Sequence, residues 1–143
     1  MTAQRTTSLM ELVLQGHNHQ RAFSAPDVFA EAVQHLKTAV HDAGTPALLP
    51  ADADAAALIG GAIIAGRGDI IQAHPDSDGR LPDKVLVVGA TVVSGKHVHD
   101  KVVAARALGA AWVGTWLWRA PAQLDADALA ADLALIDGYF ESS

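Results

Sequence analysis

The 143-residue sequence contains no cysteine, few aromatic residues (5%) and few charged ones (18%). Without cysteine, disulfide bonds, thiolate nucleophiles and cysteine-ligated zinc are excluded. The longest apolar stretches, such as 55–65, are far shorter than the roughly 20 residues that cross a bilayer. A net charge of -6 gives no general attraction to nucleic acid or anionic lipid. We therefore expect no nucleic acid and no membrane as partners, and, because no signal-peptide pattern is visible, a cytoplasmic protein.

Half of the residues are hydrophobic, which is sufficient for one core in a chain of this length. Apolar residues at helical spacing alternate with short apolar runs. We expect helices ending at Gly16, over 24–44, over 55–65, over 99–108 and from Asp125 to about Tyr139, and strands over 47–49, 69–73, 84–88 and 111–117. Runs that are apolar on both faces and separated by helices are typical of parallel strands. The sequence thus predicts a single α/β domain with an open parallel sheet and flanking helices.

Three loops should meet at the carboxyl edge of this sheet, where ligands of open parallel sheets bind. They cover residues 50–54, 74–83 and 89–97. In the third loop, Ser94, Gly95 and Lys96 precede a helix, and such a turn binds anions through backbone N–H groups and the helix dipole. Thr91 and His97 flank it as further candidate ligand contacts. The alternative is purely structural, with Gly95 in a tight turn, Ser94 capping the helix and Lys96 in solvent.

The apolar strand 85–88, the loop 89–97 and the helix that follows resemble the signature of the type I phosphoribosyltransferases. In that signature four apolar strand residues precede two acids and a phosphate-binding loop. Residues 45–74 are similar to the strand, pyrophosphate loop, helix and strand of the same family, so the resemblance spans about 24–117. It implies a phosphoribosyltransferase-like fold with a phosphate site at Ser94, Gly95 and Lys96.

Gly89 and Ala90 stand where the resemblance implies the two acids that hold the ribose hydroxyls. Our leading hypothesis is therefore a phosphoribosyltransferase-like domain that has lost transfer from phosphoribosyl pyrophosphate (PRPP) and acts as a ligand-binding, regulatory or partner-binding module. The alternative is an active transferase with an altered site, in which Asp52 and Asp54 hold a metal such as Mg²⁺ and Lys96 holds phosphate. A third hypothesis is a structural subunit of a homo-oligomer. No catalytic residue is assigned, and no cofactor is expected for the binding module.

Two acidic residues and two histidine pairs have both a structural and a functional interpretation. Asp54 is expected to be the N-cap of the helix over 55–65, and Asp52 a polar loop residue, with ligand or metal contact as the alternative. The pairs His17/His19 and His97/His99 have a spacing that suits zinc only in a strand. Because no third ligand is recognisable, we predict no metal site.

The tryptophans Trp112, Trp116 and Trp118 should share one face of the strand over 111–117 and the residue beyond it. Core packing explains such a row most simply. Trp118, nearest the carboxyl end, is also a candidate for stacking on a ligand ring, and the row is a candidate subunit interface. We accordingly expect a homodimer and a small phosphorylated ligand as the partners of this chain.

Overall fold

The computed structural model describes residues 6–8, 26–66 and 68–141. Its elements in chain order are β1 (Thr6–Ser8), α3 (Pro26–Asp42), β2 (Ala47–Pro50), α4 (Ala53–Gly66), β3 (Lys84–Thr91), α5 (Lys96–Ala107), β4 (Trp112–Pro121), α6 (Ala126–Leu129), β5 (Leu133–Ile136) and β6 (Tyr139–Glu141). The expected helix ending at Gly16 lies outside the described residues, as does Ser24.

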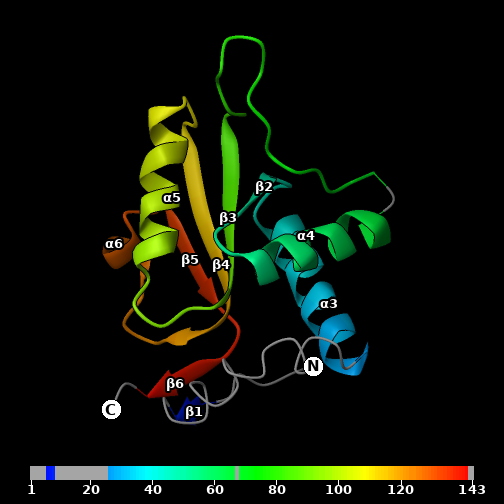
Figure 1. Cartoon of the computed structure of the whole chain (residues 1–143), viewed down its shortest axis with the longest axis vertical. Helices are drawn as coiled ribbons and strands as arrows, with labels where there is room; N and C mark the ends of the chain where they lie inside the picture. Colours follow the sequence, from blue (N-terminus) through cyan, green and yellow to red (C-terminus); the bar gives the residue numbers. More distant parts are fainter. Residues whose placement is uncertain (1–5, 9–25, 67, 142–143) are drawn as a thin grey trace.

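The strands form an open sheet in which every pairing is parallel, as predicted (Figure 1). Strands β2, β3, β4 and β5 lie in that order. The long strand β4 pairs with β5 over Gly114–Leu117 and with β6 at Ala120 and Pro121, and β6 in turn pairs with β1. The α/β class and the open parallel sheet with flanking helices are therefore confirmed.

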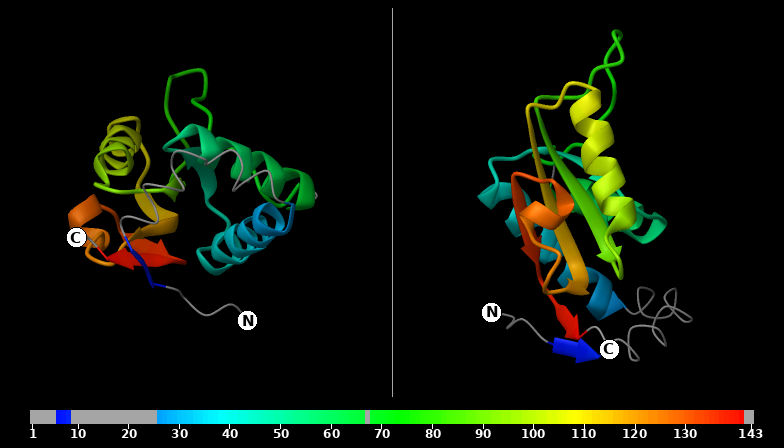
Figure 2. Two further views of the ribbon diagram at one scale, coloured as in Figure 1. Left: turned by 60° about the horizontal axis from the view of Figure 1, so that its bottom comes forward. Right: turned by 90° about the vertical axis from the view of Figure 1, so that its left-hand side faces the viewer.

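The helices cover both faces of the sheet (Figure 2). One apolar cluster joins α3 and α4 to the sheet, and it includes Leu36, Leu58 and Leu86. The other joins α5 and α6 to the opposite face, and it includes Val102 and Val87. Because side chains alternate along a strand, neighbouring residues of β3 enter different clusters. This strand is therefore buried on both sides, which explains its uninterrupted apolar run.

The connections that follow β2 and β3 leave the sheet in opposite directions. After β2, helix α4 leads to a segment that bridges the outer edge of β2, where Leu48 pairs with Gln72. After β3, helix α5 leads across the other face to β4. In open parallel sheets, the point where neighbouring connections diverge leaves a crevice at the carboxyl ends of the strands. The fold therefore predicts a binding site between the ends of β2 and β3.

The expected strand over 69–73 is wrong, since only the single bridge to Gln72 forms there. Leu48 donates its N–H to Ile71 and accepts from Ala73, so its backbone faces this outer edge. The residues two positions away on the same edge are Pro46 and Pro50. Proline has no N–H to donate, so the ladder cannot extend in either direction.

The expected helix from Asp125 to Tyr139 is also wrong beyond its first turn. Asp125 does cap a helix, because its carboxylate accepts a hydrogen bond from the N–H of Ala128 at 2.9 Å. That helix ends after four residues, and Ala130 adopts φ 56°. The apolar spacing from Leu129 onward suits a helix, yet the following residues form β5 and β6 because β4 offers an unpaired edge.

Candidate functional site

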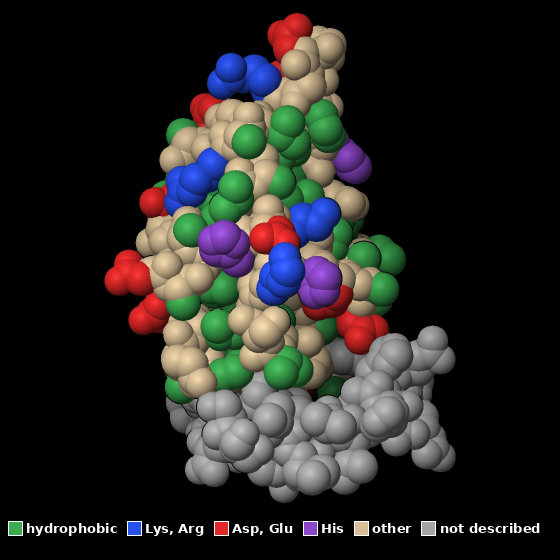
Figure 3. Space-filling view, turned by 60° about the vertical axis from the view of Figure 1, so that its left-hand side comes forward, with side chains coloured by type: hydrophobic (Ala, Val, Ile, Leu, Met, Phe, Trp, Pro, Cys, Tyr) green, Lys and Arg blue, Asp and Glu red, His purple; other side chains and the backbone are tan. Residues whose placement is uncertain are grey.

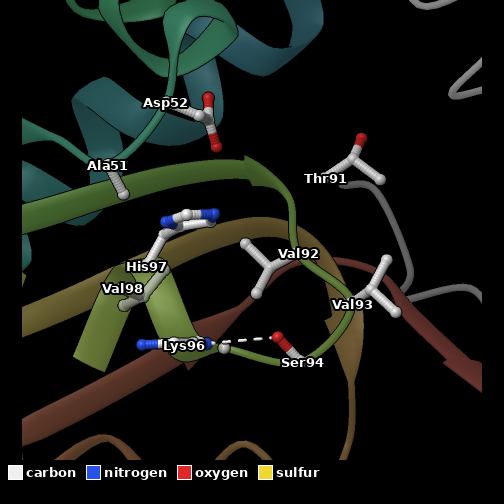
Figure 4. A pocket seen from close by; sticks show the side chains of 10 residues that line it. Ala51, Asp52, Thr91, Val92, Val93, Ser94, Lys96, His97 and Val98 are labelled. Carbon is white, nitrogen blue, oxygen red and sulfur yellow. Dashed lines mark hydrogen bonds between the residues drawn. The ribbon is translucent and has the colours of Figure 1, made fainter. Parts of the chain in front are cut away.

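A cavity of about 230 Å³ lies in the crevice between the ends of β2 and β3 (Figure 4). It is lined by Ala51, Asp52, Thr91, Val92, Val93, Ser94, Gly95, Lys96, His97 and Val98. The cavity thus brings Asp52 of the first predicted loop together with Thr91, His97 and the Ser94–Lys96 turn of the third. Asp54 and Trp118 are not among the residues that line it.

The first turn of α5 forms one side of this cavity. The helix begins after Gly95, which adopts φ 79°. A Cβ atom at Gly95 would lie 2.9 Å from Leu124, so both the backbone conformation and the space favour glycine. Gly95 provides no side-chain cap, but the hydroxyl oxygen of Ser94 accepts a long hydrogen bond from the backbone N–H of Lys96, with 3.4 Å between N and Oγ (Figure 4). Since first-turn N–H groups have no acceptor within the helix, this end offers donors to an anion.

Asp52 forms the opposite side of the cavity and is held by two backbone groups. Its Oδ1 accepts a hydrogen bond from Ala55 N at 2.6 Å, and its Oδ2 accepts one from Ala90 N at 3.2 Å. Asp52 is therefore the capping residue of α4, and the expected assignment of Asp54 as the cap is wrong. The helix starts two residues earlier than expected, which places Asp54 within its first turn. Asp52 also ties the start of α4 to the end of β3.

Lys96 is paired within its own helix. Its Nζ lies 3.2 Å from Oδ2 of Asp100, and 76% of its side chain is exposed. Hydrogen bonds from Lys96 and then from His99 hold the pKa of Asp100 below its ordinary value. Exposed ion pairs of this kind contribute little to stability. Lys96 can therefore leave Asp100 to meet an anion at the start of the helix.

The two remaining polar candidates, His97 and Thr91, occupy different parts of the cavity. In Figure 4 the imidazole of His97 extends toward Ala51 and Asp52, while Thr91 is the last residue of β3. His97 and His99 belong to a helix, where residues two apart point in different directions. In the described part of the chain, no group of three His, Cys, Asp or Glu side chains is placed to hold a metal. His17 and His19 lie outside the described residues.

The tryptophan row belongs to the core rather than to the cavity. Trp116 and Trp118 are 1% and 4% exposed, and Trp112 packs against the same cluster. The guanidinium of Arg119 lies 3.9 Å from the ring centre of Trp118, and the ring of His35 meets Trp118 edge-on. The ring of Trp118 is thus covered by Arg119 and His35 and is not free to stack on a ligand. Core packing accounts for the tryptophan row.

A polar cluster on the α3 face was not predicted. His35 Nδ1 lies 3.1 Å from Oδ1 of Asp137, and Trp116 donates its indole N–H to Oδ2 of the same carboxylate at 2.6 Å. His35 and Asp137 are 102 positions apart, and neither lies in a motif. No signal in a single sequence links them. The apolar lining of the cavity, such as Val92 and Val98, is equally hard to distinguish from core positions.

Comparison with known proteins identifies no relative of this chain. No protein-family model, no curated protein and no solved structure matches it significantly. Within the described residues, none of the helices has both the length and the apolar character needed to cross a membrane.

Proposed function

We propose that this chain is a phosphoribosyltransferase-like domain that binds a small phosphorylated ligand and does not catalyse PRPP-dependent transfer. The observation that carries the proposal is the cavity between the ends of β2 and β3, with the first turn of α5 on one side. Helix N-termini at the carboxyl edge of a parallel sheet are suited to phosphate because both the N–H groups and the dipole favour an anion.

The two positions without acids support the loss of transfer chemistry. A Cβ atom at Gly89 would lie 2.8 Å from Val92 and 2.9 Å from Leu117, so a carboxylate side chain at this position would have to displace both of them. Ala90 is fully buried, and its N–H is used by Asp52. Neither position therefore offers a side-chain acceptor to ribose hydroxyls. Without them, the orientation that transfer requires is lost.

The transferase with a metal at Asp52 and Asp54 receives less support. Each oxygen of Asp52 already accepts a backbone N–H, and only Asp52 of the two lines the cavity. A homodimer remains part of the proposal, but Trp116 and Trp118 are buried within the chain and unsuited to form its interface.

The test is a thermal-shift screen with sulfate, inorganic phosphate, ribose 5-phosphate and nucleotides. A ligand at 100 times its dissociation constant should stabilise the fold by about 2.7 kcal/mol and raise the melting temperature. Chloride at matched ionic strength is the control, because general screening affects all salts alike. If no phosphorylated compound shifts the melting temperature beyond this control, the proposed function is wrong.

A further inference from the structure

The dipeptide Asp-Gly occurs twice in the chain, and the fold places the two copies in opposite surroundings. Asp78–Gly79 lies in the loop between α4 and β3, and Asp137–Gly138 lies in the connection between β5 and β6. In Asp-Gly the backbone nitrogen attacks the aspartate side chain readily, because glycine has no side chain to obstruct the approach and its backbone rotates easily. Since the dipeptide is the same, a difference in reactivity between the two copies is set mainly by the fold.

The first copy is open to solvent. The loop that carries Asp78 and Gly79 projects beyond the sheet (Figure 1), and both residues are exposed. Figure 3 shows acidic side chains at the top of the molecule, where this loop stands in solvent. The carboxylate of Asp78 forms no hydrogen bond or ion pair with any described residue, and a Cβ atom at Gly79 would meet nothing within 4 Å. The side chain of Asp78 is therefore free to approach the nitrogen of Gly79.

The second copy is held on every side. One oxygen of Asp137 accepts the indole N–H of Trp116 at 2.6 Å, and the other lies 3.1 Å from Nδ1 of His35. Gly138 is buried, and a Cβ atom there would lie 2.5 Å from the side chain of Arg119. To react, the carboxylate of Asp137 would have to leave both partners while the backbone rotates in packed surroundings. The fold therefore protects this copy.

The exposed copy has one restraint, which is the turn formed by Asp76. Oδ1 of Asp76 accepts the N–H of Asp78 at 2.9 Å and that of Arg80 at 3.0 Å. The hydrogen bonds from Arg80 and then from Asp78 hold the pKa of Asp76 below its ordinary value, because they favour the charged carboxylate. The N–H of Gly79 in turn donates to the carbonyl oxygen of Asp76 at 2.9 Å. The turn must therefore open before the nitrogen of Gly79 can react.

We propose that Asp78 is a site of spontaneous isoaspartate formation and that Asp76 sets its rate by holding the turn closed. The nitrogen of Gly79 forms a bond to the side-chain carboxyl carbon of Asp78. The nitrogen loses its proton and the carboxyl group loses its hydroxyl, so one water leaves as the succinimide ring closes. Water then adds to either ring carbonyl and breaks its C–N bond, which yields aspartate or isoaspartate without oxidant or cofactor. Because isoaspartate adds one carbon to the backbone, it disrupts the turn around Asp76.

The test is incubation of the folded wild-type protein at neutral pH over several weeks, with isoaspartate at each site quantified by peptide mapping and mass spectrometry. Isoaspartate should form at Asp78 about ten- to a hundredfold faster than at Asp137, because Asp137 must first give up its charged hydrogen bond to Trp116. In concentrated urea, which unfolds the chain, the two sites should react at similar rates. Equal rates at the two sites in the folded protein would overturn the inference.

The role of Asp76 is tested with Asp76→Ala, which should accelerate the reaction at Asp78 about tenfold and leave Asp137 unchanged. The matched control is Asp83→Ala, which removes the same charge from an exposed residue of the same connection whose side chain bonds to no described residue. Asp78→Glu is the chemical control, because its longer side chain would have to close a larger ring, and the isoaspartate signal of the loop should disappear. If Asp76→Ala reacts no faster than Asp83→Ala, Asp76 does not hold the turn closed and the proposed restraint is wrong.

Discussion

The indole N–H of Trp116 donates a 2.6 Å hydrogen bond to Asp137, a residue of the connection between β5 and β6. The other oxygen of Asp137 faces His35 of α3 at 3.1 Å. One carboxylate therefore joins the central strand β4, the helix α3 and the last part of the chain. Since Trp116 is 1% exposed, its N–H has little access to water if this partner is removed.

We expect Asp137→Ala to lower the free energy of unfolding by about 1–3 kcal/mol, because a buried donor left without a partner costs its desolvation. Asp137→Asn should cost less, since the amide oxygen still accepts a hydrogen bond. Urea denaturation monitored by tryptophan fluorescence measures both. The control is Asp78→Ala, an exposed loop residue. If Asp137→Ala lowers the free energy of unfolding no more than the control does, the hydrogen bond between Trp116 and Asp137 does not stabilise the fold.

The cap of α4 gives a second stability prediction. Asp52→Ala should destabilise the fold by about 0.5–2 kcal/mol, because the N–H of Ala55 loses its acceptor. Asp54→Ala should cost less, since Asp54 contributes only its charge near the helix start. Thermal or urea denaturation of the two variants separates the capping residue from its neighbour. The reverse order would restore Asp54 as the cap.

The sequence predicted the parts of the fold that rest on local patterning. The apolar run of β3 was recognised because a strand that is buried on both faces is apolar at every position. The spacing in α5 was recognised because a helix that is buried on one face has apolar residues at a regular interval. The strand after α4 was mispredicted because its pairing depends on two proline residues far from it in the sequence, Pro46 before β2 and Pro50 at the end of β2. The last helix was mispredicted because the edge of β4 overrides a helical spacing that is only locally consistent.

The candidate site was predictable in position and less so in detail. Ser94, Gly95 and Lys96 were identified because a strand, a glycine turn and a helix follow one another in the chain. The partner of Asp52 was not predictable, since the bond to Ala90 joins residues 38 positions apart. The same holds for Trp118, whose place under Arg119 and His35 depends on the packing of α3. Only residue contacts across the fold decide these roles.

Asp132 gives a prediction for acid conditions. Hydrogen bonds from the N–H of Val113 and from Arg106, at 2.9 and 3.0 Å, keep its pKa below the ordinary value. The stabilisation is therefore complete above the pKa of the unfolded chain, near 3.9, and is lost as the pH falls through the lower pKa of the fold. Asp132→Asn should remove this part of the acid sensitivity in urea titrations from pH 5 to pH 2.5. Parallel stability curves for both proteins would contradict the prediction.

Transfer chemistry is the subject of a fourth prediction. PRPP-dependent transfer to common purine and pyrimidine bases should be undetectable, because Gly89 and Ala90 offer no carboxylate to ribose hydroxyls. A coupled assay for released pyrophosphate checks this, with Mg²⁺ present and an active transferase as positive control. Release of pyrophosphate that depends on both PRPP and a base would establish the chain as an enzyme.

Lys96 provides the most direct test of the proposed phosphate site. A hydrogen bond to a charged group contributes roughly 1.5–3 kcal/mol, so Lys96→Ala should weaken binding of a phosphorylated ligand about ten- to a hundredfold. The substitution should not unfold the protein, because the side chain is exposed and pairs only with Asp100 among the contacts described. Binding is measured by calorimetry with the ligand identified in the thermal-shift screen.

The control for this experiment is Lys101→Ala, which removes the same charge from an exposed position farther along α5 that does not line the cavity. Asp100→Asn provides a test in the opposite direction. It releases Lys96 from its present partner at 3.2 Å, so the lysine no longer has to give up an ion pair to reach the ligand. Affinity should therefore fall in Lys96→Ala, stay near the wild-type value in Lys101→Ala and rise in Asp100→Asn. If Lys96→Ala binds as tightly as the wild type, the loop over 89–97 is only a turn and the site assignment is wrong.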